Sequence, residues 1–127
     1  MFNSVEMFEA LRERFAKQER CAEPSCAEDG RNFQVGKKVY PPDRAEIGRA
    51  AWRYVHARAE NFNPRTAASE AAWLRSFIAL FPCKHCAHDF LEICTRLPPD
   101  FSSTEKYVQW WRDAHNAVNR DLGKPQF

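Results

Sequence analysis

Apolar residues recur at spacings of three and four along most of the chain, a pattern that predicts amphipathic helices. The first predicted helix covers residues 2–19, where Asn3 and Glu6 form a capping box. Its apolar stripe consists of Phe2, Val5, Phe8, Leu11 and Phe15. This stripe predicts a helix that packs against a hydrophobic core. Residues 20–42 interrupt the pattern with prolines and glycines, contain no convincing strand, and predict a long mobile connection.

Two helices are predicted directly after this connection. The second helix begins at Asp43, which forms a capping box with Glu46. The third follows Asn63 and Pro64, a cap and a proline at the first helical position. Pro82 lacks a backbone donor and therefore ends or kinks this third helix.

Two further helices complete the predicted fold. The fourth holds Cys83 and Cys86 in its first turn and continues to about Cys94. The fifth begins with a capping box of Ser102 and Glu105 and ends in the segment 123–125, which contains a glycine and a proline. The sequence therefore predicts an all-α bundle with an N-terminal arm.

Composition excludes several classes of protein. A chain of 127 residues with 44% hydrophobic residues predicts one domain with a packed core. The net charge of +2 gives no reason to expect nucleic acid as a partner. No run of residues is apolar enough to predict a membrane span. Charged residues interrupt the first helix from Glu6 onward, so no secretory signal is predicted.

The five cysteines cannot all pair within one chain. Cys83 and Cys86 form a C-x-x-C motif, and a cysteine in the first turn of a helix is favoured as a thiolate. Lys84, His85 and His88 add positive charge nearby. The spacing of three also brings both sulfurs within disulfide reach, which favours redox chemistry.

Other interpretations of the cysteines remain open at this point. A thioredoxin-like site is disfavoured because no strand precedes the motif. A zinc site would draw on the C-x-x-C pair, His88, Cys21 and Cys26. A structural disulfide and inert thiols are further alternatives. Cys21 and Cys26 either form a redox-active pair on a flexible segment that reaches a second site, or form a structural disulfide within residues 20–42. Cys94 is interpreted as a small buried apolar residue without an obvious partner.

Two predicted helices carry ring-bearing residues at a spacing of four. Trp52 and His56 lie on the second helix, and Trp111, His115 and Asn119 lie on the fifth. Asparagine is a poor helix former, so its presence beside these rings suggests a purpose other than helix stability. A planar ligand stacked between the two helices and held by amide hydrogen bonds would use all of these side chains.

Four motifs in this order resemble the Erv/ALR family of FAD-dependent sulfhydryl oxidases. The resemblance covers residues 43–127, and each motif alone is weak whereas their order and spacing are specific. The motifs are Gly48-Arg49-x-x-Trp52-x-x-x-His56, Pro82-Cys83-x-x-Cys86, His115-Asn116-x-Val118-Asn119 and Leu122-Gly123-Lys124-Pro125.

The resemblance implies a four-helix bundle that cradles FAD, a short fifth helix, and a homodimer. It implies that Cys83 is the exposed interchange thiol and that Cys86 is the thiol next to the flavin. It implies FAD contacts, without any metal, from Arg44, Gly48, Arg49, Trp52, His56, Cys86, Trp111, His115, Asn116, Val118, Asn119 and Lys124.

The implied activity is oxidation of protein dithiols to disulfides, with electrons passing through FAD to molecular oxygen to give hydrogen peroxide. Cys21 and Cys26 resemble the family's shuttle pair, which leaves residues 1–42 as an arm and residues 43–127 as the oxidase domain. The shuttle arm must swing or reach across a dimer. The implied partner is a thiol-containing protein substrate or an import oxidoreductase.

Some features depart from the family pattern or stay open. Many relatives link the region of Cys94 to the last long helix, but residues 104–110 contain no cysteine. We therefore expect Cys94 to be free and that helix to be held by packing alone. The expected compartment is the mitochondrial intermembrane space, with the secretory pathway as the alternative. A zinc-stabilised interaction domain without enzymatic activity is the competing hypothesis.

Overall fold

Helices dominate the part of the chain that the computed structural model describes, which is residues 4–18, 33–35, 38–40 and 42–126. The helices and strands in chain order are α1 (Ser4–Ala16), β1 (Phe33–Val35), β2 (Lys38–Tyr40), α2 (Arg44–Glu60), the 3-10 helix η2 (Pro64–Thr66), α3 (Ala67–Leu80), α4 (Lys84–Arg96) and α5 (Thr104–Leu122). The all-α prediction is confirmed. Cys21 and Cys26 lie outside the described residues, as does the cap predicted at Asn3.

The helix ends follow local capping chemistry. The Asp43 carboxylate accepts a hydrogen bond from the Glu46 backbone N–H at 2.9 Å, as the sequence predicted. The cap predicted at Asn63 for the third helix belongs to η2 instead, because α3 begins only at Ala67. Gly123 ends α5 with a φ of 71°, a conformation that glycine adopts without a Cβ clash. The predicted cap of α5 was wrong by one residue, because Ser103 rather than Ser102 accepts from the Lys106 N–H.

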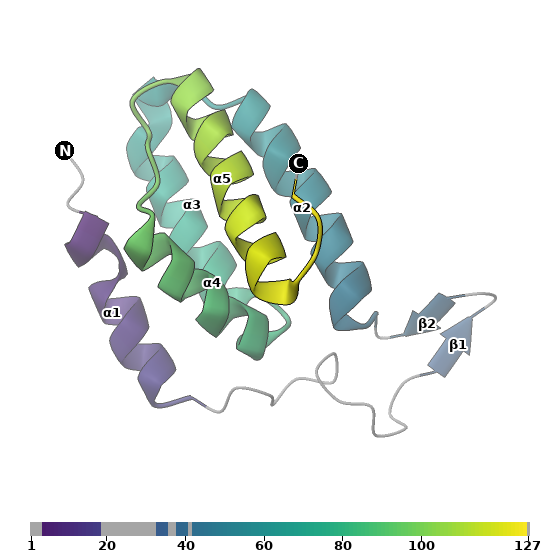
Figure 1. Ribbon diagram of the computed structural model, residues 1–127. Helices are drawn as coiled ribbons and strands as arrows, with labels where there is room; N and C mark the ends of the chain where they lie inside the picture. Colours follow the sequence, from purple (N-terminus) through teal and green to yellow (C-terminus); the bar gives the residue numbers. More distant parts are fainter. Residues whose placement is uncertain (1–3, 19–32, 36–37, 41, 127) are drawn as a thin grey trace.

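A short β-hairpin precedes α2, where the sequence had predicted no strand. The two strands pair antiparallel, with Phe33 opposite Tyr40 and Val35 opposite Lys38. Strands of three residues are too short for alternation to stand out, although aromatic and β-branched residues favour this conformation. The hairpin leads directly into α2 (Figure 1).

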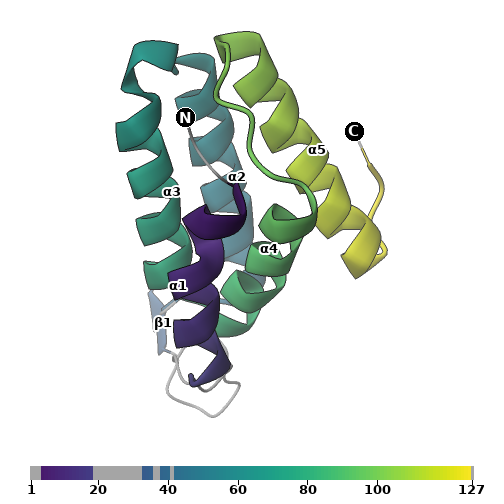
Figure 2. The same cartoon turned by 90° about the vertical axis from the view of Figure 1, so that its left-hand side faces the viewer.

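The core lies between α2, α3, α4 and α5, and α1 covers one side of it. Figure 2 shows α1 lying across α3 and α4, and the two views agree that α5 runs beside α2. Leu74, Ile78 and Ile93 are almost fully buried at the centre. Aromatic side chains fill most of the space between α5 and its neighbours, chiefly Tyr107, Trp110 and Trp111.

α1 belongs to the same hydrophobic core as the bundle. Its buried face consists of Met7, Phe8, Leu11 and Phe15, none of which is more than 8% exposed. Full burial of such a side chain stabilises by about 1.5–3 kcal/mol. The predicted packing of this helix on the core is therefore confirmed, and the four contacts together favour a docked α1.

α5 is fixed to the end of α4 by a hydrogen bond as well as by packing, which corrects the expectation of packing alone. The Trp110 indole Nε1 donates to the Leu97 carbonyl at 2.8 Å. Leu97 is the C-cap of α4, so this bond satisfies a carbonyl at the helix end. Cys94 is free and fully buried beside this junction, as expected.

A buried polar network joins α2, α3 and α5. Glu70 is 6% exposed and accepts hydrogen bonds from the Arg58 guanidinium at 2.9 Å and from the Tyr107 hydroxyl at 2.7 Å. Burial, together with the hydrogen bond to Glu70, raises the pKa of Tyr107. Because the carboxylate is paired with a cation and a hydroxyl, the network orients α5 without an uncompensated charge.

We predict that Trp110→Phe lowers the free energy of unfolding by about 1–3 kcal/mol, because the partly buried Leu97 carbonyl then lacks its donor. Urea denaturation measures this change. The matched control is Gln109→Ala on the exposed side of α5, where the lost bond to Asp113 is solvent-exposed and the expected change stays below about 0.5 kcal/mol. Equal stabilities of the two variants would contradict the role of the indole.

Candidate functional site

The C-x-x-C motif stands at the break between α3 and α4. α3 ends at Leu80, and Phe81 adopts an extended ψ of 131°, as a residue before proline favours. Cys83 is the N-cap of α4, so it lies one residue before the first turn in which we expected it. Its Sγ accepts a hydrogen bond from the Cys86 N–H at 3.2 Å. Cys83 and Cys86 form a disulfide, with their Cα atoms 5.3 Å apart.

The two cysteines differ in exposure in a way that the sequence did not predict. Cys83 is fully buried, whereas Cys86 is half-buried. The expectation that Cys83 is the exposed thiol is therefore wrong for this structure. An N-cap side chain folds back over the first helical turn, which keeps the sulfur of Cys83 inward.

The basic residues after the motif contact α1 and α3. The Lys84 Nζ donates to the Ala79 carbonyl at 2.7 Å and lies 5.1 Å from the centre of the Phe15 ring. The His88 ring lies 4.7 Å from the same phenyl ring. One face of the first turns of α4 is therefore fastened to the C-terminal end of α1.

Another face of α4 contacts a cluster of rings from α2 and α5. Phe90, one turn after Cys86, stacks on Trp111 at 5.7 Å and meets Trp52 edge-on at 6.0 Å. Trp52 in turn stacks on His115 at 3.9 Å with an angle of 8° between the rings. Phe90 thus packs α4, the helix that begins at the C-x-x-C motif, against the ring-bearing residues that the sequence singled out.

Two histidines from facing helices share a hydrogen bond in this cluster. His56 Nε2 and His115 Nδ1 are 3.0 Å apart, so one imidazole donates and the other accepts. Burial, His56 and Lys124 together lower the pKa of His115 to about 4. Burial and Arg112 lower the pKa of His56, although Glu60 opposes this shift. Both rings are therefore neutral at pH 7.

The direct stack of Trp52 on His115 corrects the prediction that a planar ligand lies between α2 and α5 at these two residues. Trp52 and His115 are already in van der Waals contact, so no third ring fits between them. Both residues are half-buried, which leaves the edges and outer faces of the stack accessible. A planar group is therefore expected against this stack rather than inside it.

The remaining predicted residues flank the stack on α2 and α5. Gly48 lies one turn before Trp52, and nothing lies within 4 Å of the position that a Cβ would take. The backbone of α2 is therefore open to a close approach at this point. Arg44, Arg49 and Lys124 are exposed, Asn116 and Val118 are half-buried, and Trp111 and Asn119 are buried.

This set of side chains fits FAD by its chemistry. The rings of Trp52 and His115 offer stacking faces to the ring systems, and neutral imidazoles and amides offer hydrogen bonds. The exposed guanidinium and ammonium groups of Arg44, Arg49 and Lys124 suit a diphosphate. Four of the predicted residues form one cluster of rings in the structure. Trp52 contacts both Trp111 and His115, and His115 also contacts His56.

Sequence reasoning missed Phe90 and the role of Phe15. Phe90 packs α4 against the ring cluster, and its position one helical turn after Cys86 is the signal in the sequence that indicates it. The stripe of the first helix predicts only a core position for Phe15, and no local pattern shows that this residue contacts Lys84 and His88.

The described residues offer neither a metal site nor a membrane-spanning helix. They contain no group of three or more His, Cys, Asp or Glu side chains arranged to hold a metal ion. No helix in the same set is sufficiently long and apolar to cross a membrane.

Comparison with known proteins gives a consistent result. Residues 49–127 match the model of the Erv1/Alr family. The mitochondrial FAD-linked sulfhydryl oxidase ERV1 of Saccharomyces cerevisiae is 33% identical, over 72% of this chain and 50% of its own length. The mitochondrial FAD-linked sulfhydryl oxidase erv1 of Schizosaccharomyces pombe is 37% identical, over 68% of this chain and 50% of its own. The chain thus spans about half the length of these relatives.

Solved structures agree in fold. The crystal structure of the yeast Erv1 core superposes with a TM-score of 0.66 at 30% identity, covering 80% of this chain and 88% of that one. A crystal structure of a double cysteine-to-serine mutant of Saccharomyces cerevisiae Erv1 gives the same TM-score and identity, covering 75% and 84% of the two chains.

We predict that the histidine pair makes stability fall in acid. The pKa of the His115 imidazole is about 6.5 in the unfolded chain and about 4 in the folded protein, so the unfolded chain takes up a proton first as the pH falls. The stabilisation is therefore complete above pH 6.5 and is lost as the pH falls toward 4. His115→Asn should flatten this part of the profile of urea midpoint against pH. Asn116→Ala, without an imidazole, should keep the wild-type slope, and an unchanged slope in His115→Asn would contradict the prediction.

Proposed function

The chain belongs to the Erv1/Alr family, and we propose that it is a FAD-linked sulfhydryl oxidase that forms disulfides in protein substrates. The observation that carries the proposal is the Cys83–Cys86 disulfide at the start of α4, the helix whose Phe90 packs against the Trp52 ring of the Trp52–His115 stack. A redox-active pair and a stacking site for a ring system are thereby combined on one rigid bundle.

The proposed FAD site uses the ring cluster and its flanks. Trp52, His56, Trp111 and His115 would hold the ring systems, and Asn116, Val118 and Asn119 would line them from α5. The basic residues Arg44, Arg49 and Lys124 would lie near the phosphates, with Gly48 allowing a close approach. When bound, FAD accepts two electrons from a thiolate and passes them to molecular oxygen, which becomes hydrogen peroxide.

The two sulfurs of the motif have different proposed roles. Cys86 is assigned next to the flavin, because it is half-buried and lies on the side of α4 that carries Phe90. Cys83 is assigned to exchange with an incoming thiolate, which would release Cys86 as a thiolate. The helix dipole and the backbone N–H groups at the start of α4 favour that thiolate. Because Cys83 is buried, the chain around it must shift before a thiolate can reach it.

Cys21 and Cys26 are proposed as the shuttle pair that takes electrons from the substrate and passes them to Cys83. Cys94 is proposed to stay outside this relay. It is fully buried, and burial raises the pKa of its thiol, which disfavours the reactive thiolate. A thiol-containing protein or an import oxidoreductase is the proposed substrate. The mitochondrial names of the relatives support a mitochondrial location. The mitochondrial intermembrane space is the proposed compartment, with the secretory pathway as the alternative.

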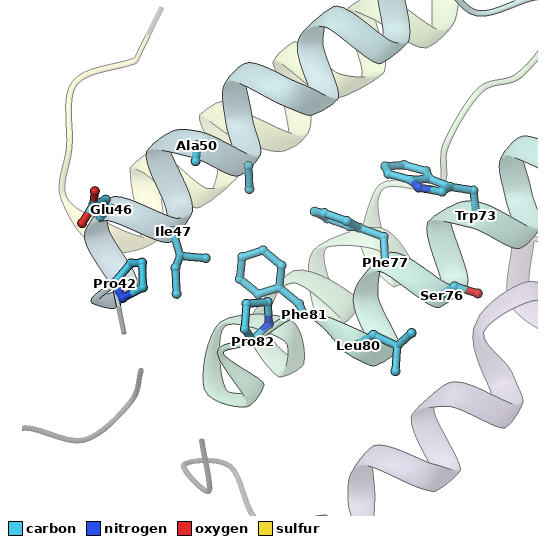
Figure 3. A pocket seen from close by; sticks show the side chains of 11 residues that line it. Pro42, Glu46, Ile47, Ala50, Trp73, Ser76, Phe77, Leu80, Phe81 and Pro82 are labelled. Atoms are coloured by element: carbon cyan, nitrogen blue, oxygen red, sulfur yellow. The ribbon is translucent and has the colours of Figure 1, made fainter. Parts of the chain in front are cut away.

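A homodimer is proposed through an apolar groove between α2 and α3. The groove has a volume of about 610 Å³, and Figure 3 shows Ile47, Phe77 and Phe81 around it. Leu80 at its rim is 77% exposed, and Tyr54, seven residues after Ile47 on α2, is 54% exposed. Apolar positions thus follow the lengths of two adjacent helices, which suits a second pair of helices better than a small ligand.

The function is tested by colour and by oxygen consumption. Purified protein should be yellow with flavin absorbance and should consume oxygen with dithiothreitol. Cys83→Ser and Cys86→Ser should lose that activity, since neither variant can form the Cys83–Cys86 disulfide. A colourless protein that contains zinc by elemental analysis would support the non-enzymatic alternative.

The same assay tests the proposed shuttle role of Cys21 and Cys26 separately from the role of the Cys83–Cys86 disulfide. Cys21→Ser and Cys26→Ser should still oxidise dithiothreitol but lose most of their activity toward a reduced protein substrate. If these variants lost both activities equally, the pair would not be a shuttle. Cys94→Ala is the matched control, and it should keep both activities.

The dimer is tested by a charge in the groove. Leu80→Asp should shift the protein from dimer to monomer in light scattering coupled to size exclusion, because a buried carboxylate at the interface is unfavourable. Leu122→Asp is the matched control, since Leu122 is 62% exposed at the end of α5, away from the groove. A dimer that survives Leu80→Asp, or one that only Leu122→Asp disrupts, would exclude this interface.

A further inference from the structure

The side chain of Lys84, the residue after Cys83, is held by both α3 and α1. Its Nζ donates a hydrogen bond to the Ala79 carbonyl at 2.7 Å, near the end of α3. The same ammonium lies 5.1 Å from the centre of the Phe15 ring of α1, which is within the range of a cation–π contact. Lys84 is half-buried, so its charge has a defined position, unlike the flexible ammonium of a surface lysine.

Phe15 is itself fixed by the core. Its side chain is 2% exposed, and it belongs to the apolar face of α1 that also includes Phe8 and Leu11. Figure 2 shows α1 lying across α3 and α4. The His88 ring of α4 lies 4.7 Å from the same phenyl ring. The ring that contacts the Lys84 ammonium is therefore part of the packed interior.

The fixed ammonium lies close to the disulfide. Adjacent Cα atoms are about 3.8 Å apart, so even a fully extended lysine places its Nζ within about 10 Å of the Cys83 Cα. This distance is about one Debye length in physiological salt, so the charge still acts on the sulfurs. The first turn of α4, all of which the structure describes, contains no acidic residue that would neutralise the ammonium.

Reduction of the disulfide creates a negative charge that Lys84 can stabilise. Two electrons enter as the Cys83–Cys86 bond breaks, and each sulfur then takes up a proton or remains a thiolate. The start of α4 favours a thiolate, and the Cys86 N–H already donates to Cys83 Sγ at 3.2 Å. A nearby ammonium stabilises the thiolate more than it stabilises the neutral disulfide. A disulfide whose reduced form is stabilised is a stronger oxidant.

We propose that Lys84 sets the redox potential of the Cys83–Cys86 disulfide and that Phe15 of α1 is a positioning residue for its ammonium. This rests on the proposed function, in which the disulfide accepts electrons from a thiol substrate. The fixed charge makes the disulfide easier to reduce, which favours uptake of electrons from the substrate. It also makes their onward transfer less favourable, so the position of the ammonium balances the two halves of the reaction.

A purely structural interpretation of Lys84 makes a different prediction. A lysine near the end of a helix also satisfies an unpaired carbonyl and complements the helix dipole there. If the bond to Ala79 had only this role, removal of the ammonium would lower the stability of the protein and leave the redox equilibrium of the disulfide unchanged. The equilibrium is therefore measured separately from stability, which urea denaturation reports.

The test is the equilibrium between the disulfide and glutathione, measured without oxygen on the full chain. Two glutathione molecules become one glutathione disulfide as the Cys83–Cys86 bond breaks, so two electrons are exchanged. Acid quenching, alkylation and mass spectrometry then give the fraction of this disulfide. Lys84→Met, which keeps an unbranched side chain against Phe15, should shift the equilibrium about three- to tenfold toward the disulfide. Lys106→Met, which removes an exposed ammonium from α5, is the matched control and should cause no shift.

Salt and a conservative variant separate charge from packing. At about 1 M salt the Debye length falls to about 3 Å, so wild type and Lys84→Met should reach the same equilibrium. Lys84→Arg keeps the charge and should stay within about twofold of wild type at low salt.

The role of Phe15 is tested by two matched core variants. Phe15→Leu keeps an apolar side chain but loses the ring, so it should shift the equilibrium toward the disulfide by less than Lys84→Met does. Phe8→Leu removes an equally buried ring from the same helix and should leave the equilibrium unchanged. Equal shifts in these two variants would exclude the positioning role of Phe15.

Three results would overturn the role of Lys84. They are a wild-type equilibrium in Lys84→Met, a shift that persists undiminished at high salt, and an equal shift in Lys84→Arg. None of these results affects the proposed function, which oxygen consumption by the wild-type protein tests independently. Conversely, a protein without oxidase activity would refute the proposed function and would still give a measurable equilibrium at this disulfide.

Discussion

The break between α3 and α4 determines where each sulfur of the C-x-x-C motif lies. Pro82 cannot continue α3, and Phe81 turns the chain so that Cys83 becomes the N-cap of α4. From this starting point the helical repeat assigns the following residues to different neighbours. Phe90 lies against the rings of α2 and α5, whereas Lys84 and His88 lie against α1. The disulfide therefore stands at the start of a helix with two distinct environments, which is the geometry that the proposed relay of electrons needs.

The ring cluster depends on how α5 is held against α2 and α4. Glu70 binds Arg58 of α2 and Tyr107 of α5, and Trp110 donates to the end of α4. These bonds set the rotation of α5 and so bring His115 onto Trp52. Burial lowers the pKa of both imidazoles and keeps them neutral at pH 7, and the positive charges of Arg112 and Lys124 add to this effect. A hydrogen bond and a buried polar network thus hold α5 without a disulfide at Cys94.

The helix caps could be predicted from the sequence, whereas the burial of individual side chains could not. The caps at Asp43 and Gly123 are correctly predicted because a cap depends on a few adjacent residues. Asn63 caps the short η2 helix instead of α3, which begins after it at Ala67. Two consecutive serines left the start of α5 ambiguous by one residue, and strands of three residues gave no usable alternation. The inward position of Cys83 and the direct contact of Trp52 with His115 follow from the packing of helices that are distant in sequence. Family resemblance supplied the candidate set, but not which of its members touch.

α1 is part of the core and supports the helix that carries the C-x-x-C disulfide. Phe8, Leu11 and Phe15 are buried in the core when the protein folds, which stabilises the docked helix. The Phe15 ring contacts Lys84 and His88, while Phe90 on another face of α4 contacts Trp52 and Trp111. The first turns of α4 are therefore packed on two sides, and this packing opposes the movement that would expose the buried Cys83.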